Sequence, residues 1–277
     1  LNMLIDQSYS FFNPKFGLSL TLSPASMFYG SYSRANREPS RSDYESNINI
    51  KPEQLNDFEL GWRFRNNGLR LNLNTYYMLY NEQLILTGEL DDVGTPIRTN
   101  SGSSYRMGIE TEASMKLSED FLIKTNLTLS SNKNQQVLSK VDGKIFDFGK
   151  TNISFSPEII TSNSIVYSPN DNLMISFLTK YVGKQFMANT DAVNSVLDSY
   201  FVNNLNFSFN INSNQVFDQI IITGLVNNIF DKEYVSNGYY YTYEDNWSNP
   251  GQVKTLDGAG YYPQAKRNFL LGLTVKF

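Results

Sequence analysis

The chain has 277 residues, with 23 Lys and Arg against 27 Asp and Glu, and it contains neither His nor Cys. Without His there is no Ser-His-Asp centre and no imidazole metal ligand. Without Cys there is no disulfide, thiolate nucleophile or zinc knuckle. A net charge of −4 with no run of Lys or Arg also lacks the positive patch of a nucleic-acid-binding protein. We therefore expect no enzyme, no bound cofactor or metal, and no nucleic-acid partner.

The start of the chain and its apolar stretches set a second limit. Residues 1–6 (LNMLID) include no initiator Met, basic segment or apolar signal-peptide core, which favours a fragment or a processed product. No stretch reaches the roughly 18 consecutive apolar residues that a membrane-spanning helix needs. If this chain crosses a membrane, it must do so as strands.

Apolar and polar residues alternate along most of the chain. Leu69, Leu71 and Leu73 alternate with Arg70, Asn72 and Asn74, and residues 105–117 repeat the pattern. A period of two predicts strands whose faces meet different environments. The pattern predicts about eleven strands, at 11–23, 26–37, 55–66, 69–82, 103–117, 121–132, 151–168, 173–187, 198–211, 219–236 and 260–277.

Short and long connections alternate between these strands. The short ones hold turn-forming residues and lie at 23–24, 66–68, 118–120, 168–172 and 212–214, whereas the long ones lie near 38–54, 83–102, 133–150, 188–197 and 237–259. Outer-membrane barrels have short periplasmic turns and long extracellular loops. A soluble β-sandwich or propeller would show shorter strands. We therefore predict an all-β fold, a transmembrane antiparallel β-barrel in the bacterial outer membrane, in contact with its lipid.

The odd number of strands bears on whether the barrel is complete. An open sheet edge in hydrocarbon leaves unpaired backbone groups, and bacterial single-chain barrels have even strand numbers. Eleven strands therefore favour a chain whose outer strands pair with others beyond this sequence. A closed barrel of eleven strands, or a twelfth strand before Phe11, is the alternative.

Several motifs resemble TonB-dependent outer-membrane receptors. These are 28–39 (FYGSYSRANREP), 50–61 (IKPEQLNDFELG), 76–84 (YYMLYNEQL), 105–110 (YRMGIE), 226–234 (VNNIFDKEY) and the ending at 262–277, in the same order as in that family. The resemblance is to iron-complex and siderophore receptors of Bacteroidetes-like bacteria. It implies that residues 1–277 form the C-terminal half of a 22-stranded barrel. The plug domain and the TonB-box segment of the family are absent from this sequence.

The resemblance also implies a function and partners. It implies an active importer that binds a siderophore or another iron complex at extracellular loops and passes it through the plugged lumen. The implied partners are the plug domain and N-terminal barrel strands of the parent protein, the TonB complex through its N-terminal part, the barrel-assembly machinery and a surface lipoprotein. The alternative function is a self-contained translocator barrel of about twelve strands, as in autotransporters, which also end in an aromatic residue.

Three groups of residues are the candidate functional sites. The alternating C-terminal residues resemble the signal that the barrel-assembly machinery reads. Charged residues on the strands are expected to face the lumen, where the family has its plug. Aromatic residues in the last long loop could line a ligand-binding mouth. The three groups are Phe269, Leu271, Leu273, Val275 and Phe277; Arg34, Glu59, Arg63, Arg106, Glu110, Glu112 and Lys180; and Tyr239, Tyr240, Tyr241, Tyr243 and Trp247.

Overall fold

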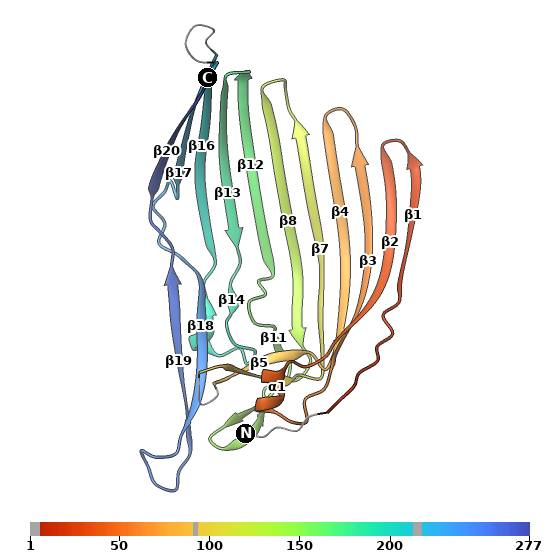
Figure 1. Cartoon of the computed structure of the whole chain (residues 1–277), viewed down its shortest axis with the longest axis vertical. Coiled ribbons are helices and arrows are strands. Elements are labelled where there is room, and N and C mark those ends of the chain that lie inside the picture. Colours follow the sequence, from red (N-terminus) through yellow and green to blue (C-terminus); the bar gives the residue numbers. More distant parts are fainter. Residues whose placement is uncertain (1–5, 91–93, 213–217) are drawn as a thin grey trace.

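The structure is a computed structural model that describes residues 6–90, 94–212 and 218–277. In these residues, eleven long strands follow one another in chain order as neighbours in one sheet, and each pairs antiparallel with the next (Figure 1). The prediction of eleven strands in an all-β fold is confirmed for this part of the chain. The strands are β1 (Lys15–Ser23), β2 (Ser26–Arg37), β3 (Glu53–Arg65), β4 (Leu69–Asn81), β7 (Ser103–Lys116), β8 (Phe121–Asn134), β12 (Ile159–Asn170), β13 (Leu173–Val182), β16 (Tyr200–Asn212), β17 (Gln219–Asn227) and β20 (Asn268–Lys276).

Some predicted strand boundaries were wrong. The strand predicted at 151–168 begins only at Ile159, and the strand predicted at 219–236 ends at Asn227. In both places the backbone leaves the extended conformation, because Phe155 and Asn228 have φ angles of 53° and 50°. The strand predicted at 260–277 is two strands, separated at 264–267.

The strand pairing divides the side chains between two faces of the sheet. Paired residues share a face, and the row Phe28, Trp62 and Leu73 belongs to one face while the row Tyr29, Gly61 and Asn74 belongs to the other. We call the first the apolar face, because large hydrophobic side chains dominate it and stand open, with Leu60 68% and Leu271 75% exposed. The second, which carries most of the charged and amide side chains of the strands, is the polar face. In water such an apolar face would be costly, but in lipid it is the expected exterior.

The two ends of the sheet differ as the connections predicted. Tight turns and the C-terminus lie at one end, the top of Figure 1, and the long connections gather at the other. We call these the turn end and the loop end. The predicted turn at 212–214 falls largely on 213–217, outside the described residues.

The long connections contain structure of their own. They hold α1 (Arg41–Ser46), β5 (Leu84–Leu90), β6 (Pro96–Asn100), β9 (Leu138–Val141), β10 (Lys144–Asp147), β11 (Thr151–Asn152), β14 (Gln185–Phe186), the 3-10 helix η1 (Val193–Ser195), β15 (Val196–Leu197), β18 (Val235–Asp245) and β19 (Lys254–Pro263). The segment 237–259, predicted as a loop, is therefore mostly a hairpin. It joins β5 and β6 in a four-stranded sheet through one parallel pair, Thr242 and Glu89.

One buried side chain links several of these connections. Asn189, which is 3% exposed, donates from Nδ2 to the carbonyl of Leu86 in β5 at 3.0 Å and accepts at Oδ1 from the backbone N–H of Ser154 at 3.0 Å. Asn134, on β8, donates to the same Oδ1 at 3.4 Å. Asn189 therefore fixes β5 against the loop ends of neighbouring strands.

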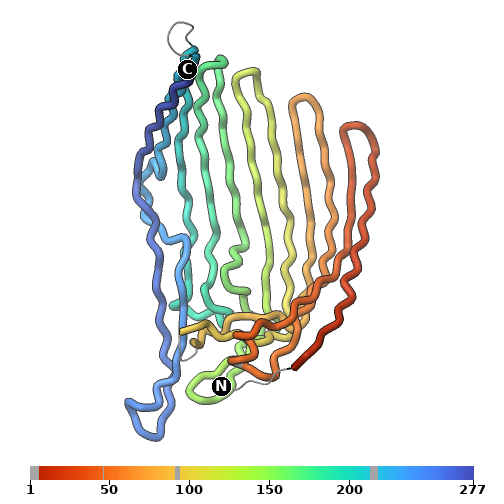
Figure 2. The backbone as a smooth tube through the Cα atoms, viewed as in Figure 1, coloured from red at the N-terminus to blue at the C-terminus, as the bar shows by residue number. Residues whose placement is uncertain are grey.

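The sheet is open. Its strand order begins at β1 and ends at β20 without a pairing between them, and Figure 2 shows the two strands on opposite sides. Both run from the loop end toward the turn end, so direct closure of these eleven strands would require a parallel pair. Among the described residues, no helix is long and apolar enough to cross a membrane.

Candidate functional site

The polar face collects most of the charges that were predicted to face the lumen. Glu59 shares this face with Tyr76, and Glu110 shares it with Asn74. Pairing across neighbouring strands extends the same face to Lys180 through Ser162. Six of the seven predicted residues therefore lie together on the polar face: Glu59, Arg63, Arg106, Glu110, Glu112 and Lys180.

Several of these charges are held in place by neighbours on the same wall. The guanidinium of Arg63 lies 4.8 Å from the centre of the Tyr29 ring. Glu112 Oε2 accepts a hydrogen bond from Asn72 Nδ2 at 3.2 Å. Arg106 Nη1 donates to Ser156 Oγ at 2.7 Å.

The carboxylates at the centre of the polar face differ, because in the described part of the chain no cation forms an ion pair with them, and Lys15 on β1 acts on Glu59 only through its charge at longer range. Within 6–90, 94–212 and 218–277, the structure gives neither Glu59 nor Glu110 an ion pair or a hydrogen bond, and Asp57 Oδ1 is buried without a partner. A buried unpaired acceptor is costly and indicates a donor that this chain does not supply. The three carboxylates therefore form an acidic patch on the polar face.

The predicted position of Arg34 was wrong. Arg34 pairs with Asn56, which pairs with Leu79, and this row belongs to the apolar face. Along β2, Arg34 lies an even number of residues from Phe28 and Tyr32, so its side chain emerges on their side of the sheet. The even or odd position of a residue along its strand, and not its charge, decides which face it occupies.

Four of the five predicted loop aromatics form a strip on one face of the β18–β19 hairpin. Ring centroids are 6.3 Å apart between Tyr239 and Tyr241, 6.4 Å between Tyr241 and Tyr243, and 6.1 Å between Tyr243 and Trp247. The rings of Tyr239 and Tyr241 occupy the space above Gly260 and Gly258 of the partner strand. We call these four side chains the aromatic strip. Tyr239 and Trp247 are 51% and 65% exposed, so the strip is accessible.

Tyr240 lies on the opposite face of the hairpin, which other loops cover. Burial and the nearby charge of Asp257, to which it is hydrogen bonded, raise the pKa of Tyr240 to about 12. Asn194 Nδ2 donates to Asp257 Oδ2 at 3.1 Å, and Asp142 accepts from the backbone N–H of Thr255 at 2.8 Å. Tyr240 is therefore a packing residue of the loop layer and does not join the aromatic strip.

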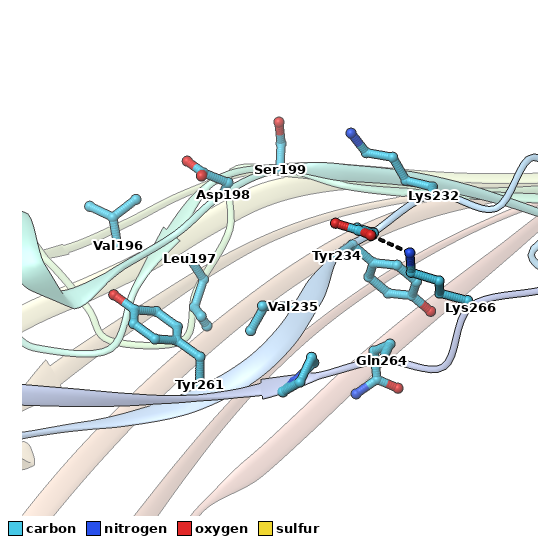
Figure 3. A pocket seen from close by; sticks show the side chains of 12 residues that line it. Val196, Leu197, Asp198, Ser199, Lys232, Tyr234, Val235, Tyr261, Gln264 and Lys266 are labelled. Carbon is cyan, nitrogen blue, oxygen red and sulfur yellow. Dashed lines mark ion pairs between the residues drawn. The ribbon is translucent and has the colours of Figure 1, made fainter.

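A cleft at the base of the hairpin was not predicted. It has a volume of about 560 Å³ and lies between Leu197 on one side and Val235 and Tyr261 on the other (Figure 3). Lys266 and Glu233 form an ion pair beside it. Its walls come from three segments distant in sequence, and no local pattern marks them.

The predicted assembly signal lies on the apolar face of the last strand. Phe269 pairs with Val226, Leu271 with Gly224 and Leu273 with Ile222. Phe269 and Leu273 are 72% and 69% exposed on this edge strand, and Phe277 follows the strand directly. Recognition by assembly machinery stays a prediction.

Within the described ranges, no three Asp or Glu side chains group closely enough to hold a metal ion. The acidic patch, the aromatic strip and the cleft can bind through hydrogen bonds, ion pairs and ring contacts.

Comparison with known proteins places the chain in a family. The family model for the TonB dependent receptor-like β-barrel matches residues 4–229. No curated protein sequence matches the chain.

Solved structures share the fold. The siderophore receptor PiuA from Acinetobacter baumannii has 16% sequence identity and a TM-score of 0.69 over 94% of this chain and 35% of its own. The ferric citrate transporter FecA, unliganded, has 16% identity and a TM-score of 0.67 over 94% and 37%. The copper transporter OprC has 16% identity and a TM-score of 0.66 over 92% and 38%.

The chain thus spans little more than a third of these proteins, and the likeness shows the fold alone. The family model, which covers most of the sequence, the open antiparallel sheet and the polar and apolar faces agree. This chain belongs to the TonB dependent receptor-like β-barrel family and forms part of such a barrel.

Proposed function

We propose that this chain is the C-terminal barrel half of a TonB-dependent active importer in the bacterial outer membrane. The observation that carries the proposal is the open antiparallel sheet, which has an apolar face, a polar face and its long connections at one end. Barrels of about 22 strands have a plugged lumen in outer-membrane transporters. The N-terminal strands of the parent protein would pair with β1 and β20 and close the wall. The chain binds and guides its ligand and performs no bond chemistry.

The acidic patch is the proposed contact with the plug domain. Asp57, Glu59 and Glu110 lie on the polar face, and within the described ranges no cation forms an ion pair with them. Arg or Lys side chains of a plug would supply the donors that these carboxylates lack. Arg63, Arg106, Glu112 and Lys180 extend the same contact surface. The TonB complex would act on the plug through the N-terminal part of the parent protein.

The proposed ligand is a siderophore or another iron complex. PiuA is a siderophore receptor and FecA is a ferric citrate transporter, and both share this fold. The aromatic strip and the neighbouring cleft, both at the loop end, offer ring surfaces and hydrogen-bonding groups for capture. A surface lipoprotein would be a further partner at this end. An origin in Bacteroidetes-like bacteria stays a prediction.

The alternative of a self-contained translocator is less consistent with the fold. Direct closure of eleven strands would pair β1 with β20 in parallel, and the described residues before β1, 6–14, form no strand that could serve as a twelfth. No described segment threads the polar face as a helix, since α1 lies at the loop end.

Uptake of radioactive iron by cells that carry the full-length receptor tests the proposal. A panel of ferric catecholate, hydroxamate and citrate complexes would be supplied to cells with and without TonB. We expect TonB-dependent uptake of at least one complex. The double variant Tyr241→Ala/Tyr243→Ala should weaken its binding, while the control Tyr77→Ala, on the apolar face, should not. Equal uptake without TonB, by a receptor shown to be at the surface, would contradict the proposal.

A further inference from the structure

We propose that the apolar face carries a binding site for the phosphorylated head group of a membrane lipid, built from Arg34 and Asn56. The lipid chains would lie in an apolar groove on the same face. This inference rests on the proposed function, because it requires the apolar face to meet the membrane.

Arg34 lies near the loop end of the apolar face. Its register places it on the apolar face, two residues beyond Tyr32 toward the loop end. An Arg directed at lipid is tolerated where its guanidinium reaches the head-group layer. The structure gives Arg34 no carboxylate partner among the described residues. The positive charge at this position is therefore available to an anion from outside the chain.

Hydrogen-bonding side chains lie around Arg34 and form a cluster with it. The Tyr32 hydroxyl and Arg34 Nε both donate to Asn56 Oδ1, each at 3.0 Å. These two bonds orient the guanidinium and occupy Asn56 Oδ1. The Tyr32 hydroxyl oxygen can still accept, and the other groups left over are donors, the two Nη nitrogens of Arg34 and Nδ2 of Asn56. A cluster of oriented donors around a guanidinium matches the acceptor oxygens of a phosphate.

The cluster of Tyr32, Arg34 and Asn56 lies where the apolar face changes to polar side chains. On β3 the apolar face reads Phe64, Trp62, Leu60 and Phe58 from the turn end, and then changes to Asn56 and Gln54. Gln54 donates to Asn36 Oδ1 at 3.2 Å, and Asn81 donates to Gln54 Oε1 at 3.4 Å, so a row of carboxamides follows. The Tyr32 and Phe58 rings, 5.0 Å apart, lie on the turn-end side of this row. Aromatic rings capped by polar groups mark the interface between hydrocarbon and head groups.

An apolar groove that could hold the lipid chains lies on the same face. A groove of about 720 Å³ on the wall is lined mainly by Leu18, Leu20, Phe28, Leu60, Trp62 and Leu73. Leu60 is four residues from Asn56 along β3, about 13 Å at about 3.3 Å per residue. The donor cluster and the groove thus follow one another from the loop end toward the turn end. A phosphate with attached acyl chains fits this order, whereas a free phosphate uses only the cluster.

Arg37 provides a matched comparison on the same strand. It lies three residues from Arg34, an odd number, and therefore on the polar face. There its Nη2 forms an ion pair with Glu53 Oε2 at 3.7 Å. Substituting it removes the same charge near the same end of the barrel without touching the proposed site. Arg37→Gln is therefore the control for Arg34→Gln.

The test measures lipid bound to the full-length receptor purified from outer membranes. Native mass spectrometry would count bisphosphorylated lipid A retained by the wild type, Arg34→Gln, Arg34→Lys and Arg37→Gln. Dephosphorylated lipid A and inorganic phosphate would be tested as competitors. Losing one charge-assisted pair to phosphate should lower lipid affinity about tenfold for Arg34→Gln. Arg34→Lys should recover part of the affinity, and Arg37→Gln should retain all of it.

Three results would overturn the inference. These are equal lipid retention by Arg34→Gln and the wild type, equal binding of dephosphorylated lipid A, and displacement of the lipid by inorganic phosphate at millimolar concentration. Heat-dependent electrophoretic mobility of the same samples reports whether each receptor is a folded barrel. If Arg34→Gln forms a folded barrel in the outer membrane and binds lipid as the wild type does, only this inference is refuted. If the wild-type receptor itself is absent from the outer membrane, the proposed function is refuted.

Discussion

The ring of Tyr29 on β2 occupies the space above Gly61 on β3, where any other side chain would project. Its hydroxyl reaches the next strand and donates to Asn74 Oδ1 at 3.1 Å. Register places Tyr29, Gly61 and Asn74 in one row across three strands. One side chain thereby ties three strands together on the polar face, and it does so only because Gly61 has no Cβ.

Gly61→Ala should therefore destabilise the barrel. The new methyl group would displace the Tyr29 ring, and with it the bond to Asn74 and the contact with Arg63. We expect a loss of about 1–3 kcal/mol, typical of an overfilled site. The melting temperature of the folded full-length barrel, read by heat-dependent electrophoretic mobility, measures this. Gly17→Ala is the control, since a Cβ there meets only atoms at ordinary distances of 3.7 and 3.8 Å. An equal melting temperature for both variants would contradict the role of Tyr29.

Two adjacent residues of β13 test the assignment of the faces. Phe177 pairs with Ile165 and Leu205 on the apolar face, and Ser176 pairs with Asn206 on the polar face. A Lys at the middle of a lipid-facing wall costs about 2–4 kcal/mol. Phe177→Lys should lower stability in lipid bilayers by this amount, while Ser176→Lys should be tolerated. Denaturant unfolding in vesicles measures both, and a larger loss for Ser176→Lys would reverse the assignment.

The loop layer should loosen in alkali through Tyr240. Its pKa is raised to about 12 by burial and Asp257, against about 10 for an unperturbed Tyr. The stability linked to its neutral form is therefore complete below pH ~10 and is lost as the pH rises through about 12. The difference in phenolate absorbance between wild type and Tyr240→Phe should titrate near the upper value. In the background of Asp257→Asn the same difference should titrate at lower pH. An unchanged midpoint would show that Asp257 does not raise the pKa of Tyr240.

Asn189 should control the ordering of β5. Asn189→Ala leaves the carbonyl of Leu86 and the N–H of Ser154 without their partner, at about 1–3 kcal/mol for each buried group that stays unpaired. The connection at 82–102 should then be cut faster by added protease in intact cells, while the barrel strands stay resistant. Asn246→Ala, at an exposed position in the hairpin tip, should leave the cleavage rate unchanged. Equal rates for the two variants would show that Asn189 does not hold β5.

The fold was accessible from the sequence because alternation is a local property of each strand. Leu69, Leu71 and Leu73 reveal an apolar face without knowledge of any partner strand. Counting every second residue from Phe28 to Arg34 would have placed Arg34 on the apolar face. The error came from assigning a face by charge. The hairpin at 235–263 was missed because consecutive Tyr residues occupy both of its faces and remove the period of two. Asn189 and Leu86 are 103 residues apart, and no local signal connects them.

The structure of the full-length receptor in a lipid nanodisc would show directly how the open sheet is closed. We predict a closed barrel of about 22 strands, in which β1 and β20 each pair with a strand from outside this chain. It also predicts plug cations against Glu59 and Glu110. A barrel closed by these eleven strands alone, or with one added strand and a single helix in the lumen, would contradict it.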